Sequence, residues 1–285
     1  GLGPLLKEVA PILNAQTPQQ LAVTLALLSR AGISQLIGWY TSIDSKDPQK
    51  YTFYMTQSGL NLPDEAYYRE DKYEQVCSAY IEHIARVFEL TGLAEGFSLT
   101  PAEAAKLIFA HEAEIAAHHW DVVANRDAEA RYNPVDAAEL EEKFPGFQFS
   151  HWLRALGADP DSMGKVVVSQ PSFFEGVARL WEQTPLLTWK LWAVWNAVHS
   201  RAPFMYDELV QANFDFYGRT LSGTEKLRDR WKRGVGTVEK ALDQEVGKEY
   251  VAVHFPPEHK AKMLKLVDNL LEAYRRSITN LEWMT

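Results

Sequence analysis

The stretch around residue 111 carries side chains that could bind a metal ion. It has the apolar spacing of a helix and places His111, Glu114 and His118 within two turns of one face. A helical zinc site of the His-Glu-x-x-His type needs two imidazoles one turn apart, with the glutamate as general base. Here Ile115 occupies the second histidine position, and His111 and His118 are roughly 10 Å apart along the axis. We therefore expect a hydrogen-bonded structural face, with a partial metal site at His111, Glu114 and His118 as the alternative.

The other reactive residue types do not form a catalytic group. The single cysteine, Cys77, lies in a helical stretch at a position compatible with a buried face, where cysteine usually acts as a small apolar side chain. The sequence has no Gly-x-Ser-x-Gly elbow and no phosphate-binding loop. The pair Gly234 and Gly236 does not continue as a dinucleotide-binding motif, because Glu239 stands where the third glycine is needed. The residues alone therefore show no complete catalytic constellation.

Composition excludes several classes of protein. The 285 residues carry 29 Lys and Arg against 38 Asp and Glu, a net charge of −9 that argues against nucleic-acid binding. One cysteine excludes a disulfide scaffold, and an aromatic content of 12% excludes low-complexity disorder. The longest apolar runs, such as residues 21–28, are about eight residues, too short for a membrane-spanning segment. We expect a soluble, mainly helical protein that forms a single domain over residues 1–285.

Local signals place most of the elements. Residues 36–43 and 51–57 are rich in β-branched and aromatic types around a turn-forming segment, which predicts a β-hairpin. The sequence Thr100-Pro101-Ala102-Glu103 is a capping box that begins a helix reaching about Asn125. Residues 166–168 are either a short strand or a buried connector. Further helices are predicted at 63–90, from Asn133-Pro134 onward, and at 171–183, 186–200, 203–217, 222–244 and 256–281.

Aromatic side chains recur at near-helical spacing in the second half of the chain. Trp181, Trp189, Trp192 and Trp195 form such a stripe. A stripe of this kind usually fills the core between packed helices, and a groove for a carbohydrate or aromatic ligand is the alternative.

Five groups of short strings, in this order and spacing, carry a family resemblance. They are residues 58–68 (SGLNLPDEAYY), 126–127 with 132–133 (RD and YN), 170–174 (QPSFF), 216–223 with 230–233 (FYGRTLSG and RWKR), and 246–251 with 281–285 (VGKEYV and LEWMT). Together they resemble the N-terminal half of the neprilysin family of zinc metallopeptidases, and most closely its soluble actinobacterial members. The likeness runs from near Gly1 to Thr285.

The resemblance implies a role within a longer enzyme. Members of the family have two mainly helical lobes around a chamber, and the catalytic lobe holds zinc with a His-Glu-x-x-His motif that lies beyond the position of Thr285. This chain would then be the lid lobe, with no cofactor of its own and zinc in the parent enzyme. Its partners would be the catalytic lobe of the same polypeptide and oligopeptide substrates, with no nucleic acid and no membrane segment. The fragment alone is expected to be inactive.

The residues within these strings have structural interpretations. Asp64 is placed to cap a helix. A second group of complementary donors and acceptors would tie a helix end to the next turn, and it consists of Arg126, Asp127, Tyr132 and Asn133. Trp231 would be a core anchor beside charges that extend outward.

The sequence alone is compatible with more than one cellular compartment and with a second function. A single cysteine and the absence of Asn-x-Ser/Thr acceptors favour a bacterial protein, either cytoplasmic or secreted and envelope-associated. The alternative function is a free-standing helical module that binds a protein or ligand without enzymatic activity.

Overall fold

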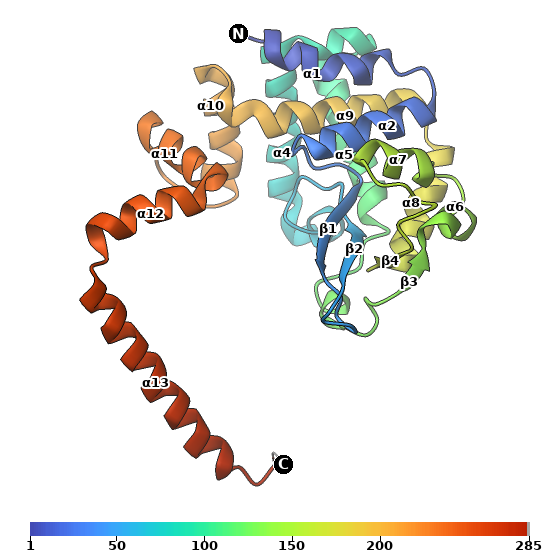
Figure 1. The fold of residues 1–285 in the computed structure, drawn as a ribbon. Helices are drawn as coiled ribbons and strands as arrows, with labels where there is room; N and C mark the ends of the chain where they lie inside the picture. Colours follow the sequence, from blue (N-terminus) through green and yellow to red (C-terminus); the bar gives the residue numbers. More distant parts are fainter. Residues whose placement is uncertain (284–285) are drawn as a thin grey trace. The chain divides into compact units, whose positions relative to one another are not determined.

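A computed structural model describes residues 1–283 of the chain (Figure 1). Helices make up most of it, which confirms the mainly helical fold class. By its internal contacts the chain divides into two compact units, Gly1–Glu225 and Lys226–Thr285, and the single domain over residues 1–285 stays a prediction. Among the described residues, no helix is both long and apolar enough to cross a bilayer.

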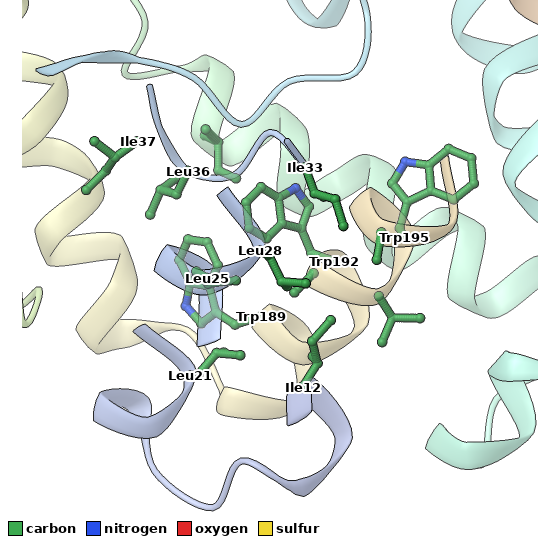
Figure 2. Close-up of a cluster of buried hydrophobic side chains, with 14 of the residues drawn as sticks. Ile12, Leu21, Leu25, Leu28, Ile33, Leu36, Ile37, Trp189, Trp192 and Trp195 are labelled. Carbon is green, nitrogen blue, oxygen red and sulfur yellow. The ribbon is translucent and has the colours of Figure 1, made fainter. Parts of the chain in front are cut away.

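The first unit is built around α9 (Leu186–Arg201), which is apolar on almost every side. Every residue from Leu191 to Val198 is buried, and a helix buried in this way needs neighbours all round. Contacts with α1 (Gly3–Asn14), α2 (Pro18–Arg30) and α5 (Pro101–Ala116) provide them. Figure 2 shows the indoles of this helix among aliphatic side chains of the N-terminal segment. The tryptophan stripe is therefore core, as the first of the two interpretations predicts.

The other helical elements of this unit are mostly short. Its remaining α-helices are α3 (Ala66–Arg69), α4 (Glu74–Thr91), α6 (Leu140–Lys143), α7 (Phe149–Leu156), α8 (Pro171–Gln183) and α10 (Asp207–Asn213). Its 3₁₀ turns are η1 (Asp71–Tyr73), η2 (Leu93–Phe97), η3 (Ala124–Arg126), η4 (Ala137–Glu139) and η5 (Ala202–Phe204), and η6 (Phe214–Thr220) is a π-helix. The single helix predicted over 203–217 is thus divided among η5, α10 and η6.

A four-stranded sheet lies beside the helices. The predicted hairpin is confirmed as β1 (Ile37–Ile43) paired antiparallel with β2 (Tyr51–Gln57). The segment predicted as a strand or connector is a strand, β4 (Lys165–Val168). It runs parallel to β2 and antiparallel to β3 (Pro134–Asp136), so the strand order is β1-β2-β4-β3.

The helix predicted to start at Asn133-Pro134 is wrong. This segment forms β3 instead, because it pairs with β4 and buries Val135 opposite Val166. β3 is at one edge of the sheet, where a proline removes no ladder hydrogen bond that the sheet needs.

Two predicted helices are shorter than expected. The helix predicted over 63–90 breaks at Glu70, whose backbone is extended, so α3 and α4 are separate. The helix predicted to reach Asn125 ends at Ala116. Just beyond it, the backbone N–H of Trp120 donates to the side-chain oxygen of Gln57 in β2 at 2.8 Å. A sequence pattern does not reveal such a distant acceptor.

The described part of the second unit, residues 226–283, has three helices, and none of their side chains is buried. They are α11 (Arg230–Ala241), α12 (Asp243–His254) and α13 (Pro257–Thr279). The helix predicted over 222–244 therefore starts later than expected. Trp231 on α11 is 67% exposed, which differs from the predicted core anchor. The physical reason is that the described part of this unit offers no core of its own for an indole to enter.

Candidate functional site

A buried carboxyl group lies where the loop at 58–65 meets three helices. Glu112 on α5 is 0% exposed. Its oxygens accept hydrogen bonds from Asn61 Nδ2 and Tyr68 Oη, both at 2.7 Å, and from Tyr80 Oη at 3.0 and 3.1 Å. A buried carboxyl group needs such donors, because unpaired burial of a polar group is strongly unfavourable. These residues form the Glu112 junction, defined as Asn61, Tyr68, Tyr80 and Glu112.

Burial dominates the protonation of this group. It raises the pKa of Glu112 to about 7, although the hydrogen bonds from Asn61, Tyr68 and Tyr80 lower it. The Tyr68 and Tyr80 hydroxyls are also buried, and burial together with the neighbouring Glu112 charge raises their pKa well above the usual value. Both tyrosines therefore stay neutral donors, and Glu112 exchanges between acid and carboxylate near neutral pH.

The junction extends into α9. Trp195 Nε1 donates to Tyr80 Oη at 2.9 Å, and Asn61 Nδ2 donates to Asn196 Oδ1 at 2.7 Å. The loop can approach this closely because of Gly59, whose φ of +99° is rarely adopted by other residues. A side chain at Gly59 would also touch the Trp192 ring at 3.4 Å. The junction thus joins the loop, α3, α4, α5 and α9.

The candidate metal residues do not converge on one point. His111 Nδ1 lies 3.4 Å from Glu114 Oε2, and its ring packs edge-on against Trp189 at 4.2 Å between centroids. Burial lowers the pKa of His111 to about 4. The His118 ring instead packs against α8 at Gly176, where an added Cβ would overlap it. Across residues 1–283 no group of three or more His, Cys, Asp or Glu could hold a metal ion, so His111, Glu114 and His118 do not fit zinc.

Three of the residues predicted to tie a helix end to the next turn, Asp127, Tyr132 and Asn133, make hydrogen bonds in the structure. Asp127 Oδ1 accepts from the backbone N–H groups of Glu129 and Ala130, both at 3.0 Å. Tyr132 Oη donates to Asp44 at 3.0 Å. Asn133 Nδ2 donates to the backbone oxygen of Val168 at 3.2 Å. These bonds connect the turn to the hairpin and to β4.

Two further residues are singled out by the sequence. Asp64 lies just before the start of α3, and Arg126 lies in η3, near the turn that holds Asp127. Asp64 Oδ1 accepts from the backbone N–H of Ala66 at 3.0 Å, which is a helix-start hydrogen bond. Arg126 is exposed. Its neighbour Asn125 makes the internal contacts instead, because its side-chain oxygen accepts from Gln170 Nε2 at 2.8 Å.

The whole chain, residues 1–285, matches the family model described as Peptidase family M13. The chain belongs to peptidase family M13. Its fold is similar to zinc metalloprotease Zmp1 of Mycobacterium tuberculosis in complex with an inhibitor, with a TM-score of 0.92 and 45% identity over 100% of this chain and 43% of that one. The open state of Zmp1 gives a TM-score of 0.87 and 46% identity, over 100% of this chain and 44% of that one.

An M13 relative of lower identity matches as well. Endothelin-converting enzyme 1 of Homo sapiens is 25% identical over 249 residues, which is 86% of this chain and 32% of that protein. The M13 chain therefore spans about a third of the curated relative and less than half of Zmp1. These matches confirm the resemblance to the neprilysin family.

Sequence reasoning misses two of the residues that organise this M13 chain. Glu112 stands among the histidines of α5 in the sequence, although its partners Tyr80 and Asn61 lie 32 and 51 residues away along the chain. Gln170 is 2% exposed, and its oxygen accepts from the backbone N–H of Gln57 at 2.9 Å. The one available signal for Gln170 is its place in the string at 170–174, directly before the proline that begins α8.

Proposed function

We propose that this M13 chain is the lid lobe of a longer zinc metalloendopeptidase that hydrolyses oligopeptides. The similarity to Zmp1 over all of this chain and 43% of the other supports a place within a longer polypeptide. In the neprilysin family the zinc motif belongs to the other lobe. The metal and the catalytic groups would therefore come from the remainder of the polypeptide.

The role of this chain would be steric. A lid limits access to a reaction chamber and closes over substrates small enough to enter. Such a wall must keep its shape, and the Glu112 junction favours this by joining one loop to four helices. Tyr80 and Glu112 are fully buried, so these two groups rigidify the core rather than contact substrate.

The observation that carries the proposal is the exposed apolar face of α13. Five apolar side chains there are 45 to 62% exposed and follow one another at three- and four-residue spacing: Met263, Val267, Leu270, Tyr274 and Ile278. That spacing places them on one side of the helix. Folded proteins rarely leave such a surface uncovered, so it points to a partner. The occupant we propose is the remainder of the same polypeptide, because the Zmp1 chain is more than twice as long as the part matched here.

Peptide hydrolysis tests the proposal directly. The 285-residue chain and the full-length product of its gene would each be incubated with zinc and a fluorogenic oligopeptide. We expect turnover from the full-length protein, loss of turnover with a chelator, and none from the 285-residue chain. Turnover that copurifies with the shorter chain would contradict the proposal. A full-length protein without turnover would favour the binding module.

The apolar face is tested by a matched pair of variants in the full-length protein. Leu270→Gln lies on the apolar side of α13, and Lys265→Gln introduces the same residue on the polar side. Loss of one buried leucine costs about 1.5–3 kcal/mol, so Leu270→Gln should lower the stability of the assembled enzyme. Lys265→Gln should leave it close to wild type. Equal melting temperatures for the two variants would remove the docking argument.

A further inference from the structure

The first unit contains a cavity whose lining shares no residue with the Glu112 junction. Its volume is about 680 Å³, and it is lined by α4, α10 and η6. Cavities that hold small organic molecules are typically about 300–1,000 Å³, so this one has room for a ligand of that size. No role described above uses it.

The floor of the cavity is aromatic and buried. His83 and Phe216 both line it and are 6% and 3% exposed, and their rings stack at 5.1 Å between centroids. Burial, with a smaller effect from His199, lowers the pKa of His83 to about 3, so the imidazole is neutral. Its Nε2 is buried without a hydrogen-bond partner among the described residues. The floor is therefore apolar, and one buried polar atom without a hydrogen-bond partner, His83 Nε2, lies within it.

The rim of the cavity is negative. Glu82, Asp207 and Glu208 line it, and none has an ion-pair partner in the described part of the chain. The one cation among the lining residues, Arg86, is 3.0 Å from Glu89. The fourth rim carboxylate, that of Asp215, is already paired with an arginine at 2.6 Å. Three carboxylates thus lie without an ion-pair partner above an apolar floor, two of them in the first turn of α10, and this excess of negative charge favours a ligand of positive charge.

One wall has an unusual backbone. η6 is a π-helix, a conformation that is rare and frequently found at functional sites. Within it, a Cβ at Gly218 would overlap the Phe214 ring, so glycine is required for this packing. Because Phe216 belongs to the same π-helix, the wall and the floor are positioned together.

We propose that this cavity binds a small organic cation, with its apolar body on His83 and Phe216 and its ammonium or guanidinium group at the rim carboxylates. An aromatic or aliphatic body suits the stacked floor, and cations are attracted to both aromatic faces and carboxylates. The inference does not rest on the proposed peptidase function, because it needs neither a catalytic lobe nor a reaction chamber.

Three probes that share one body test the charge requirement. Binding of 4-phenylbutylamine, 4-phenylbutanol and 4-phenylbutyrate to the 285-residue chain would be measured by isothermal titration calorimetry at low salt. We expect the amine to bind, the alcohol to bind more weakly and the carboxylate not to bind. Added salt should weaken binding of the amine but leave binding of the alcohol unchanged. Equal affinity for amine and alcohol, or no binding of the amine, would overturn the proposal.

Matched variants then locate the site. Glu82→Gln and Glu208→Gln should each lower the affinity for the amine by about two- to fivefold, as expected for the loss of an exposed ion pair. Glu142→Gln removes an exposed carboxylate on α6, outside the cavity lining, and should change nothing. Ala79→Trp fills the cavity and should lower the affinities for the amine and for the alcohol alike, by about tenfold or more. Circular dichroism confirms folding of each variant. Unchanged binding in both glutamine rim variants, or an equal loss in Glu142→Gln, would refute this location.

Discussion

Tyr80 and Glu112 are 32 residues apart in the sequence, and the tyrosine hydroxyl lies 3.1 and 3.0 Å from the two carboxyl oxygens. The same hydroxyl accepts a hydrogen bond from Trp195 Nε1 at 2.9 Å. One oxygen atom on α4 therefore satisfies a carboxyl group on α5 and an indole on α9.

Removal of that hydroxyl should destabilise the protein. Tyr80→Phe leaves Glu112 with fewer donors and leaves the Trp195 N–H without an acceptor. Each buried polar group left unpaired costs about 1–3 kcal/mol, so we expect a loss of that order in the free energy of unfolding. Urea denaturation followed by circular dichroism measures it. Tyr40→Phe, at a residue that is 41% exposed, is the control, and an equal effect from both would contradict the role of the junction.

The Glu112 junction should also make stability depend on pH. The folded-state pKa of Glu112 is raised to about 7 from an ordinary value of 4.5, so near neutral pH the folded protein holds a proton that the unfolded chain releases. Its stabilising contribution is therefore complete below pH 4.5 and is lost as the pH rises through 7, by up to about 3 kcal/mol.

Glu112→Gln removes this titration. The stability difference between wild type and Glu112→Gln, measured by urea denaturation at about pH 5 and pH 8, should shift in favour of the variant at the higher pH. Glu142→Gln, at an exposed residue, is the control. A difference that is the same at both pH values for Glu112→Gln would show that this carboxyl group does not titrate near neutral pH.

The elements that the sequence predicts correctly are those set by local signals. The capping box at Thr100 needs only its own turn, and its reciprocal bonds with Glu103 are present. The start of α8 is also local, because Pro171 occupies its first helical position, where proline is favoured. A hairpin is likewise a local structure, so β1 and β2 are predictable.

The elements that the sequence does not predict depend on distant partners. β3 exists because it pairs with β4, about 30 residues further along the chain. Glu112 shares a helix with His111 and Glu114, and helical spacing reveals only that shared position. Its actual partners come from other elements, as the 51 residues between it and Asn61 illustrate. Spacing along one helix therefore cannot distinguish a metal-binding face from a buried junction.

His83 should contribute the opposite pH dependence. Burial depresses its folded-state pKa to about 3 from 6.5, so the unfolded chain takes up a proton that the folded protein does not. Stability from this group is present above pH 6.5 and is lost as the pH falls, by about 2 kcal/mol at pH 5. His83→Phe keeps an aromatic ring on Phe216 and removes the titration. Its stability relative to wild type should rise between about pH 8 and pH 5, and a constant difference would show that His83 does not titrate in this way.

Gly146 should tolerate no side chain, for a reason separate from titration. Its φ is +117°, and a Cβ there would overlap the backbone oxygen of Ala178 in α8 and lie 2.9 Å from its carbonyl carbon. A backbone atom cannot rotate away as a side chain can, so Gly146→Ala must displace α8. We expect the free energy of unfolding to fall by about 3 kcal/mol or more. Gly92→Ala is the matched control, since its φ is also positive at +68° but nothing lies within 4 Å of the added Cβ. That variant should lose only about 1–2 kcal/mol, the cost of the left-handed conformation. Equal losses in urea denaturation would mean that the close approach to α8 contributes nothing.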